Sequence, residues 1–315
     1  MTYSWGDGTP FHTYHRYLQN TLGYQVRKIP VDAGFTCPNR DGTVGTGGCT
    51  FCLNEAFTPH YCNSRHSITQ QIHDGVAFHA QRRRPIDKFF VYFQAFSNTH
   101  APTARLRECY NEALAIPHVQ GLIIATRPDC LTDEVLDYLE KLQENVYLCV
   151  EIGIESLHDE TLRRINRGHD TASTLRALDM LANRHIPVCG HLIFGLPGET
   201  PELWLQDTAI LNRLPIATLK LHQLQILSHT PIEQEWVVKP EDFHTFTAEG
   251  YITFLTDYIE RLSPTIAIER LANEVPTRYL ASPSWHGIRH QEIVQAVIRS
   301  LEARHSWQGK KKAEP

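Results

Sequence analysis

The sequence predicts an α/β protein, a partial (β/α)6 barrel with a small C-terminal α+β extension. Two observations predict this fold. Six short segments rich in Val, Ile, Phe and Tyr alternate with segments of helical pattern, which is typical of parallel βαβ units. Polar residues gather at the ends of these apolar segments, as they do at the carboxyl ends of the strands in parallel barrels, where active sites lie.

The expected strands are Tyr24–Val31, Lys88–Gln94, Gly121–Thr126, Tyr147–Ile154, Pro187–Phe194 and Thr218–Gln223. The expected helices between them are a helix that starts at Ser67, with a capping box completed by Gln70, and Pro102–Ala115, Thr132–Glu144, Thr171–Arg184 and Thr200–Leu214. Right-handed crossovers wind such units into an open or partial barrel.

The chain divides into three expected regions, which are a barrel at 22–230, an extension at 231–305 and a disordered tail at 306–315. Within the extension we expect a helix near Pro240–Arg261, a strand near Thr265–Arg270 and a helix near His290–Arg304. The tail is rich in lysine, which favours a solvated end.

Composition excludes several classes of protein. The 315 residues carry 30 Lys plus Arg against 35 Asp plus Glu, so the net charge of -5 argues against a bulk nucleic-acid coat protein. The longest apolar runs, such as Leu122–Ala125, are far shorter than the ~20 residues of a membrane span, and no signal peptide is visible. We therefore expect a cytoplasmic protein with no membrane contact, in which eight cysteines favour metal binding or catalysis over disulfides.

Three cysteines lie in one glycine-rich loop after the first expected strand. Cys37, Cys49 and Cys52 have the spacing C-x11-C-x2-C. Thiolates bind soft metals and iron–sulfur clusters, and three protein ligands to a 4Fe-4S cluster leave one iron open for a substrate or cofactor. Two alternatives stay open, namely a structural zinc with Cys62 or a nearby histidine as fourth ligand, and free thiols that cluster by chance.

The fourth expected strand carries two carboxylates on one face. Cys149, Glu151 and Glu155 alternate with apolar residues that should pack on helices. Lys220 and His222 share a face of the sixth strand in the same way. Because buried carboxylates are costly unless they are paired, the barrel interior is expected to hold either a structural lattice of Glu and Lys or a polar cavity for a cofactor.

These features resemble the radical S-adenosylmethionine (SAM) superfamily. Cys49, Phe51 and Cys52 match its C-x-aromatic-C ending, although the gap between Cys37 and Cys49 is longer than usual. The YhcC-like branch of the superfamily has this expanded loop, and so does the catalytic subunit of Elongator. Segments that are similar to the YhcC-like branch are Gly34–Thr43, Tyr92–Phe96, Thr126–Asp129 and Arg164–His169.

The resemblance implies roles for ten residues. Cys37, Cys49 and Cys52 would ligate a 4Fe-4S cluster, and SAM would chelate the open iron through its amino and carboxylate groups. The residues that the resemblance places at the cofactor site are Gln94, Arg127, Glu155, Arg167, His191, Lys220 and His222.

Six of these seven have counterparts in related enzymes, and His222 is one of them, since it stands where Elongator-like enzymes often have Tyr. Gln94 begins the turn in the place of the family's glycine-rich motif, whose backbone meets the SAM amino group. Glu155 stands where related enzymes have Gln or Glu. Arg167 matches an arginine that contacts SAM in coproporphyrinogen-dehydrogenase-like members, and its planar fork suits a carboxylate. His191 replaces an Asp of those members, and Lys220 resembles a lysine of Elongator-like enzymes.

The resemblance implies an enzyme that takes one electron from a flavodoxin- or ferredoxin-like donor, cleaves SAM and generates a 5′-deoxyadenosyl radical. The likeness to Elongator suggests the C5 side chain of a tRNA wobble uridine as substrate, so tRNA is an expected partner. Basic runs at 82–84 and 310–312 could contact phosphates. The alternative hypothesis is a non-catalytic RNA- or protein-binding module with a structural zinc.

Overall fold

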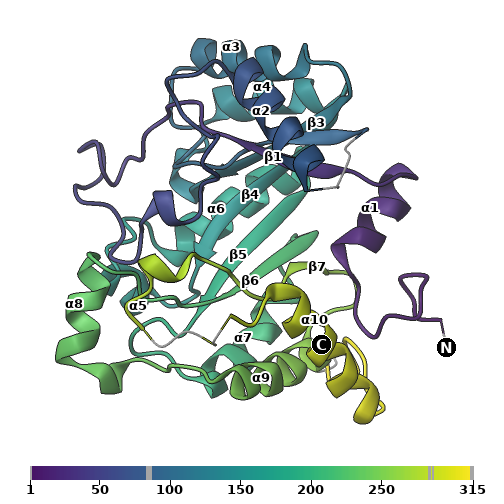
Figure 1. Ribbon diagram of the computed structural model, residues 1–315, viewed down its shortest axis with the longest axis vertical. Helices are drawn as coiled ribbons and strands as arrows, with labels where there is room; N and C mark the ends of the chain where they lie inside the picture. The colour runs from purple at the N-terminus through teal and green to yellow at the C-terminus, as the bar shows by residue number, and fades with distance from the viewer. Residues whose placement is uncertain (1, 83–86, 283–284, 286, 313–315) are drawn as a thin grey trace.

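The structure, a computed structural model, describes residues 2–82, 87–282, 285 and 287–312. Seven parallel strands form one sheet in chain order, and the sheet curls into a half-barrel (Figure 1). The strands are β1 (Arg27–Val31), β2 (Phe89–Phe93), β3 (Val119–Thr126), β4 (Tyr147–Glu155), β5 (Val188–Phe194), β6 (Thr218–Gln223) and β7 (Ala267–Arg270). The predicted α/β partial barrel is confirmed, and all six expected barrel strands are present.

The seventh strand is the strand that was expected in the C-terminal extension. Ala267 and Ile268 of β7 pair in parallel with Thr218 and Leu219 of β6, so β7 continues the barrel sheet. On its free edge, the Ile268 backbone N–H donates to the His12 carbonyl at 2.8 Å. A four-residue strand has too short a pattern to indicate which sheet edge it joins.

The helices of the barrel begin at hydrogen-bonding side chains. Ser67 Oγ accepts from the Gln70 backbone N–H at 3.1 Å and starts α2 (Ile68–Gln81). The Gln70 side chain donates to Asp74 at 2.9 Å, so the bond back to Ser67 that would complete the predicted capping box is not made. The later barrel helices are α3 (Thr103–Leu114), α4 (Asp133–Gln143), α6 (Thr171–Ala182) and α7 (Pro201–Leu211).

Three helices were not predicted. They are α1 (Tyr14–Leu22), which lies beside β7, the short α5 (Asp159–Arg164) and α8 (Pro231–Val238) (Figure 1). The C-terminal region also contains α9 (Ala248–Arg261) and α10 (His290–Ala303), and short 3-10 turns occur at Asn54–Ala56, Pro128–Cys130, Pro240–Asp242 and Thr277–Tyr279. The helix expected over Pro240–Arg261 therefore begins later than predicted.

The sheet separates two apolar regions. Leu148, Val150 and Ile152 of β4 face the helices and belong to the large outer core. Cys149 of the same strand faces inward, with Phe90 of β2 and neighbouring apolar groups. This alternation is the period of two that β strands impose, and it directs Glu151 into the lumen as predicted.

The segment expected to be a disordered tail packs against the fold over residues 306–312. Gln308 is fully buried, and its amide donates to the carbonyls of Ser263 and Ile266 at 2.7 and 2.8 Å. Its carbonyl oxygen accepts from the His12 backbone N–H at 2.8 Å. Composition misled here because one buried amide anchors a segment that is otherwise lysine-rich. Residues 313–315 lie outside the described residues.

Candidate active site

The loop between β1 and α2 carries the three predicted cysteine ligands. The Cys37 carbonyl accepts from the Arg40 backbone N–H at 2.8 Å, and the Cys49 carbonyl accepts from that of Cys52 at 3.0 Å. Gly48 has a φ of 81°, and a Cβ there would lie 2.7 Å from the Arg40 side chain, so the loop needs glycine at this point. All three cysteines are free thiols.

One cavity of about 640 Å³ lies at the carboxyl ends of the strands. Its lining includes all ten residues that the sequence placed at the site, namely Cys37, Cys49, Cys52, Gln94, Arg127, Glu155, Arg167, His191, Lys220 and His222. The polar strand ends therefore converge on one space, from β1 on one side to β7 on the other.

Arg167 lies directly beside one of the cysteines. Its Nη1 donates to Cys49 Sγ at 3.5 Å, and its Nη2 donates to the Gly153 carbonyl at 2.7 Å and pairs with Glu155 at 3.2 Å. Burial opposes the charge of Arg167, but Cys49 and Glu155 outweigh it and raise the pKa of the guanidinium. Arg167 is therefore a fixed cation at the edge of the cysteine loop.

Arg127 positions Arg167 through a hydrogen bond to its backbone carbonyl. Its Nη1 donates to the Arg167 carbonyl at 2.7 Å, while Nε and Nη2 donate to the two carboxylate oxygens of Asp129 at 2.9 and 2.8 Å. Such bidentate geometry is strong and directional. The guanidinium of Arg127 is thus committed to protein groups although it borders the cavity.

Glu155 ends β4 in an unusual backbone conformation. Its φ is 66°, in the left-handed region, and the pairing of β4 with β5 shifts register between Gly153 and Glu155. A non-glycine residue in this region costs about 1–3 kcal/mol and persists where surrounding contacts over-determine it. Here the contact is the ion pair with Arg167, which fixes the carboxylate at the cavity wall.

The turn after β2 is anchored across three strands. The Ser97 backbone N–H donates to the Thr36 carbonyl at 3.2 Å, and the Asn98 side-chain amide donates to the carbonyls of Phe93 and Ala125 at 3.0 and 2.8 Å. Gln94, at its start, donates to Phe57 at 3.4 Å. These bonds give a glycine-free turn a fixed position at the cavity.

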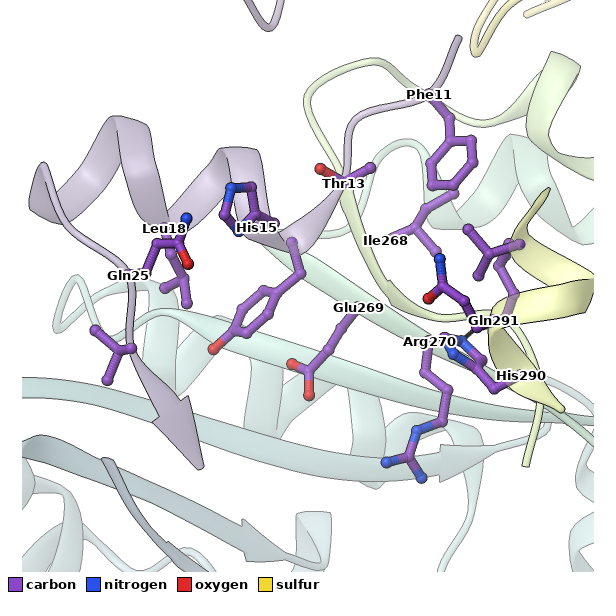
Figure 2. Close-up of a pocket in the computed structure, with 14 residues that line it drawn as sticks. Phe11, Thr13, His15, Leu18, Gln25, Ile268, Glu269, Arg270, His290 and Gln291 are labelled. Atoms are coloured by element: carbon purple, nitrogen blue, oxygen red, sulfur yellow. Dashed lines mark hydrogen bonds between the residues drawn. The ribbon is translucent and has the colours of Figure 1, made fainter. Parts of the chain in front are cut away.

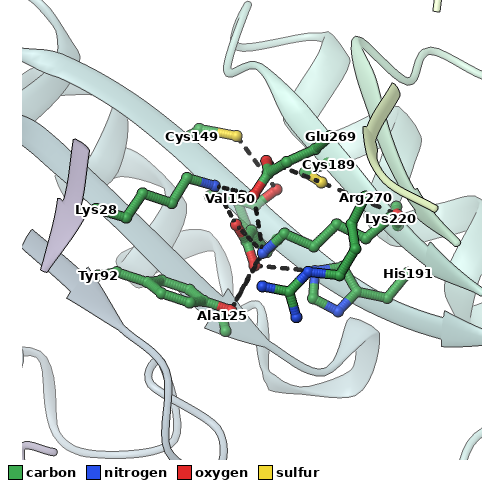
Figure 3. A network of polar contacts seen from close by, with 12 residues as sticks. Lys28, Tyr92, Ala125, Cys149, Val150, Cys189, His191, Lys220, Glu269 and Arg270 are labelled. Carbon is green, nitrogen blue, oxygen red and sulfur yellow. Dashed lines mark hydrogen bonds and ion pairs between the residues drawn. The ribbon is translucent and has the colours of Figure 1, made fainter. Parts of the chain in front are cut away.

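A network of charged groups occupies the lumen below the cysteine loop (Figure 3). We call it the floor network, and its members are Lys28, Tyr92, Glu151, His191, Lys220 and Glu269. Glu151 is its centre, because its carboxylate contacts Lys220 at 2.6 Å and Lys28 at 2.8 Å. Lys28 also contacts Glu269 at 2.6 Å. The network balances two lysines against two glutamates.

Two further side chains complete the coordination of Glu151. The Tyr92 hydroxyl donates at 2.6 Å, and His191 Nε2 lies 2.9 Å from the same carboxylate oxygen. Burial by itself would raise the pKa of Glu151, but Lys220, Lys28 and the bond with His191 hold it well below its usual range. Glu151 is therefore a stable buried anion, and both alternatives for the lumen apply, since a Glu–Lys lattice lies under a polar cavity.

Four residues that line the cavity were not expected there, namely Lys28, Tyr92, Glu269 and Arg270. Tyr92 could have been found, since it carries the one polar group of the apolar strand β2, whereas Lys28 follows Arg27 in β1 and does not stand out. Glu269 and Arg270 could not, because the placement of β7 decides their surroundings. Both also line a smaller cavity of about 300 Å³ between α1 and β7 (Figure 2).

The residues proposed for a zinc site do not gather around the three cysteines. Cys62 Sγ donates to the Pro30 carbonyl at 3.1 Å, and Cys62 lines a separate cavity with His60. Within the part of the chain that the structure describes, the group whose ligand atoms all lie within 4.8 Å of one another is Glu151, Cys189 and His191. That group already contacts two lysine ammonium groups, which would repel a cation.

Comparisons with known proteins decide the family. The family model described as Radical SAM superfamily matches residues 40–207, and the Radical_SAM C-terminal domain model matches residues 216–302. The chain belongs to the radical SAM superfamily. It is therefore an enzyme of this superfamily, as predicted, rather than a non-catalytic zinc module. Among the described residues, no helix is long and apolar enough to cross a membrane.

Relatives place this radical SAM protein in the expected branch. It is 36% identical to YtqA of Bacillus subtilis, covering 95% of this chain and 92% of YtqA, and 34% identical to YhcC of Escherichia coli, covering 85% of each. A tRNA uridine(34) acetyltransferase of Dehalococcoides mccartyi is 28% identical over 59% of this chain and 39% of that protein.

The fold is also similar to that of an archaeal relative. The structure of Methanocaldococcus infernus Elp3 with an N-terminal deletion has a TM-score of 0.67 and 17% identity, covering 90% of this chain and 64% of that one. At this identity the likeness concerns the fold alone, and this fold extends over the C-terminal region as well as the barrel.

Proposed function

We propose that this protein binds a 4Fe-4S cluster through Cys37, Cys49 and Cys52 and cleaves SAM reductively. The observation that carries the proposal is the convergence of the three free thiols and the polar strand ends on one cavity. When bound, the cluster and SAM would supply a 5′-deoxyadenosyl radical that abstracts a hydrogen atom from substrate. The chain's own residues bind, orient and shield these groups.

The donor set fits an iron–sulfur cluster. A single tetrahedral zinc, with bonds of about 2.3 Å, needs its sulfurs about 4 Å apart. Among the described residues, the three loop cysteines are not part of any group whose ligand atoms lie within 4.8 Å of one another. They border one cavity with Arg40 and Arg167, cations that would offset the negative charge of a thiolate-ligated cluster. A wider set of three thiols suits several irons.

Arg167 and Glu155 are the residues we propose to hold SAM. Nη1 of Arg167 uses one hydrogen on Cys49, which leaves a second hydrogen for the SAM carboxylate. Glu155 offers a carboxylate to the SAM hydroxyl or amino groups. We propose Arg127 as a positioning residue, since its Nε and Nη2 donate to Asp129 and its Nη1 donates to the Arg167 carbonyl.

Gln94 and the floor network complete the proposed site. The turn that starts at Gln94 presents backbone groups to the SAM amino group. His191, Lys220 and His222 lie on the lumen side, where they would meet substrate rather than the cluster. A charge-balanced floor keeps the lumen polar without leaving an unpaired buried carboxylate.

We propose a tRNA wobble-uridine side chain as the substrate. The partial similarity to a tRNA uridine(34) acetyltransferase supports this choice. A reductant is needed, and a flavodoxin- or ferredoxin-like protein fits that need. A reducing cytoplasm suits eight free thiols. The basic run at 82–84 is described only at Arg82, and its other two residues lie outside the described residues.

The test is anaerobic turnover of SAM. Reconstituted protein with dithionite should form 5′-deoxyadenosine and methionine, and total tRNA should then lose or gain a wobble nucleoside seen by mass spectrometry. Cys52→Ala should abolish SAM cleavage, while Cys109→Ala, which removes a thiol of the outer core, should not. Absence of 5′-deoxyadenosine from the wild type would refute the radical chemistry. If SAM is cleaved but the tRNA nucleosides stay unchanged, tRNA is refuted as the substrate while the radical chemistry stands.

A further inference from the structure

An exposed arginine at the end of β7 borders the cavity beside the floor network. Arg270, at the end of β7, borders the cavity and donates to Asn273 Oδ1 at 3.0 Å. Within the described part of the chain, no carboxylate lies at ion-pair distance from it. The two lysines of the floor are matched by two glutamates, and Glu274, a further carboxylate of the lining, makes no ion pair with Arg270, so this guanidinium is available to an anion.

A buried imidazole beside it interacts with the Asn273 side chain and has one nitrogen without a partner. His222 is 7% exposed, and its Nδ1 has no hydrogen-bond partner among the described residues. Its ring lies 5.5 Å from the ring of His191. Burial, followed by the charges of His191 and Arg270, holds the pKa of His222 well below its usual range, so the ring is neutral. A neutral imidazole has one N–H to donate.

The sheet register brings these two groups to the same wall. Arg270 stands opposite Lys220 in the pairing of β6 with β7, and His222 follows two residues later on the same face of β6. The segment after β7 is tied to β6, because Gln223 and Asn273 exchange two hydrogen bonds of 3.0 and 2.9 Å. In Figure 3 the Arg270 side chain extends from the end of β7 toward the lumen.

The arginines beside the cysteine loop and the arginine of this wall interact with different groups. Burial opposes the charges of Arg40 and Arg167, but their interactions with the cysteines raise the pKa of each guanidinium. Arg270 instead acts on His222 and His290. The cavity therefore has two positive regions, one at the cysteine loop and one at β6 and β7.

We propose that Arg270 and His222 form a subsite that binds a carboxylate of the substrate. The proposal rests on the proposed function, because it assigns the cysteine side of the cavity to SAM. The guanidinium fork can bind both carboxylate oxygens, and His222 can add a third bond in the tautomer that carries its proton on the unpartnered Nδ1. One cation and one neutral donor match a monoanion better than a phosphate dianion, which needs more positive charge. The subsite selects substrates whose side chain ends in a carboxylate.

The test is a titration of reconstituted, SAM-saturated enzyme with acetate, followed through the ¹⁵N signals of the His222 imidazole. Acetate should shift them saturably in the millimolar range, and the uncharged isostere acetamide should not. Arg270→Gln should weaken acetate binding by about tenfold, and Arg270→Lys should weaken it less. Arg278→Gln, at an arginine that borders only the separate cavity with His60, is the matched control and should bind as wild type does.

The remaining outcomes refute the proposal in distinguishable ways. No saturable shift in the wild type, or equal binding by Arg270→Gln, would overturn the subsite. A shift that occurs only without SAM would assign Arg270 to the carboxylate of SAM instead of substrate. Tighter binding of dimethyl phosphate, a phosphodiester monoanion, than of acetate would assign it to a nucleic-acid phosphate. Reductive SAM cleavage, measured on the same wild-type preparation, reports separately on the proposed function.

Discussion

Arg167 donates a hydrogen bond to the sulfur of Cys49 at 3.5 Å, and the same guanidinium pairs with Glu155 at 3.2 Å. One side chain thus links the proposed cluster ligand to the proposed SAM site. This link has consequences for reduction potential as well as for binding.

Replacing Arg167 with Met should lower the reduction potential of the cluster. A reduced cluster carries one more negative charge, so a neighbouring cation stabilises the reduced form. Loss of about 1.4 kcal/mol of this stabilisation corresponds to about 59 mV, and we expect a fall of several tens of mV in an EPR-monitored redox titration. Arg163→Met, at an exposed arginine of α5, is the control, and equal potentials in both variants would rule the link out.

Gly153→Ala should disturb the ion pair between Arg167 and Glu155. A Cβ at this position would lie 2.4 Å from Arg167 Nη2 and 2.5 Å from Glu155 Oε1, so both groups must move. We expect SAM affinity to fall about tenfold in equilibrium binding, because one charge-assisted hydrogen bond is lost. Gly250→Ala in α9 should leave SAM affinity unchanged. Wild-type affinity in Gly153→Ala would argue against SAM contacting Arg167.

Glu151→Gln should destabilise the fold. It leaves two buried lysines with one carboxylate between them, and removing one partner of a buried ion pair costs about 3–5 kcal/mol. Denaturant unfolding measures this loss. Glu160→Gln, at an exposed position of α5, should cost little. The double variant Glu151→Met with Lys220→Met should recover part of the stability, and a single variant as stable as wild type would contradict the described network.

The floor network also predicts acid sensitivity. The pKa values of Glu151 and Glu269 lie below their ordinary values in the folded state, because Lys220 and Lys28 outweigh the effect of burial. Their stabilisation is therefore present above the unfolded pKa of about 4.5 and is lost as pH falls below it. Urea unfolding of cluster-free protein from pH 7 to about pH 3 should show this loss, and Glu151→Gln should flatten it. If the free energy of unfolding fell equally with pH in the wild type and in Glu151→Gln, the acid sensitivity could not be assigned to Glu151.

How far the sequence predicts the fold depends on pattern length. The six longer strands and the helices between them have clear periodicity, and the structure confirms them. β7 is four residues long, and only the tertiary structure reveals that it continues the sheet. The N-terminal helix α1 was missed because its apolar face is narrow and includes tyrosines, which do not mark a helix by themselves.

The same limit applies to the site. Polar strand ends predicted a site at one edge of the sheet, because parallel strands share that edge. The family resemblance, and not strand position, placed Arg167 and His191 there. The partners of Glu151 were only partly predictable, since Lys220 lies on a recognised strand whereas Lys28 was not singled out and Glu269 depends on β7. Arg127 donates hydrogen bonds to Asp129 and to the Arg167 carbonyl. The spacing of residues along the sequence does not predict this local geometry.

The most direct test is iron and acid-labile sulfide analysis of anaerobically reconstituted protein. The account predicts about four irons and four sulfides per chain in the wild type and in Cys62→Ala, with loss of most of both in Cys37→Ala, Cys49→Ala and Cys52→Ala. Zinc without sulfide in the wild type, or a full cluster in Cys49→Ala, would contradict it.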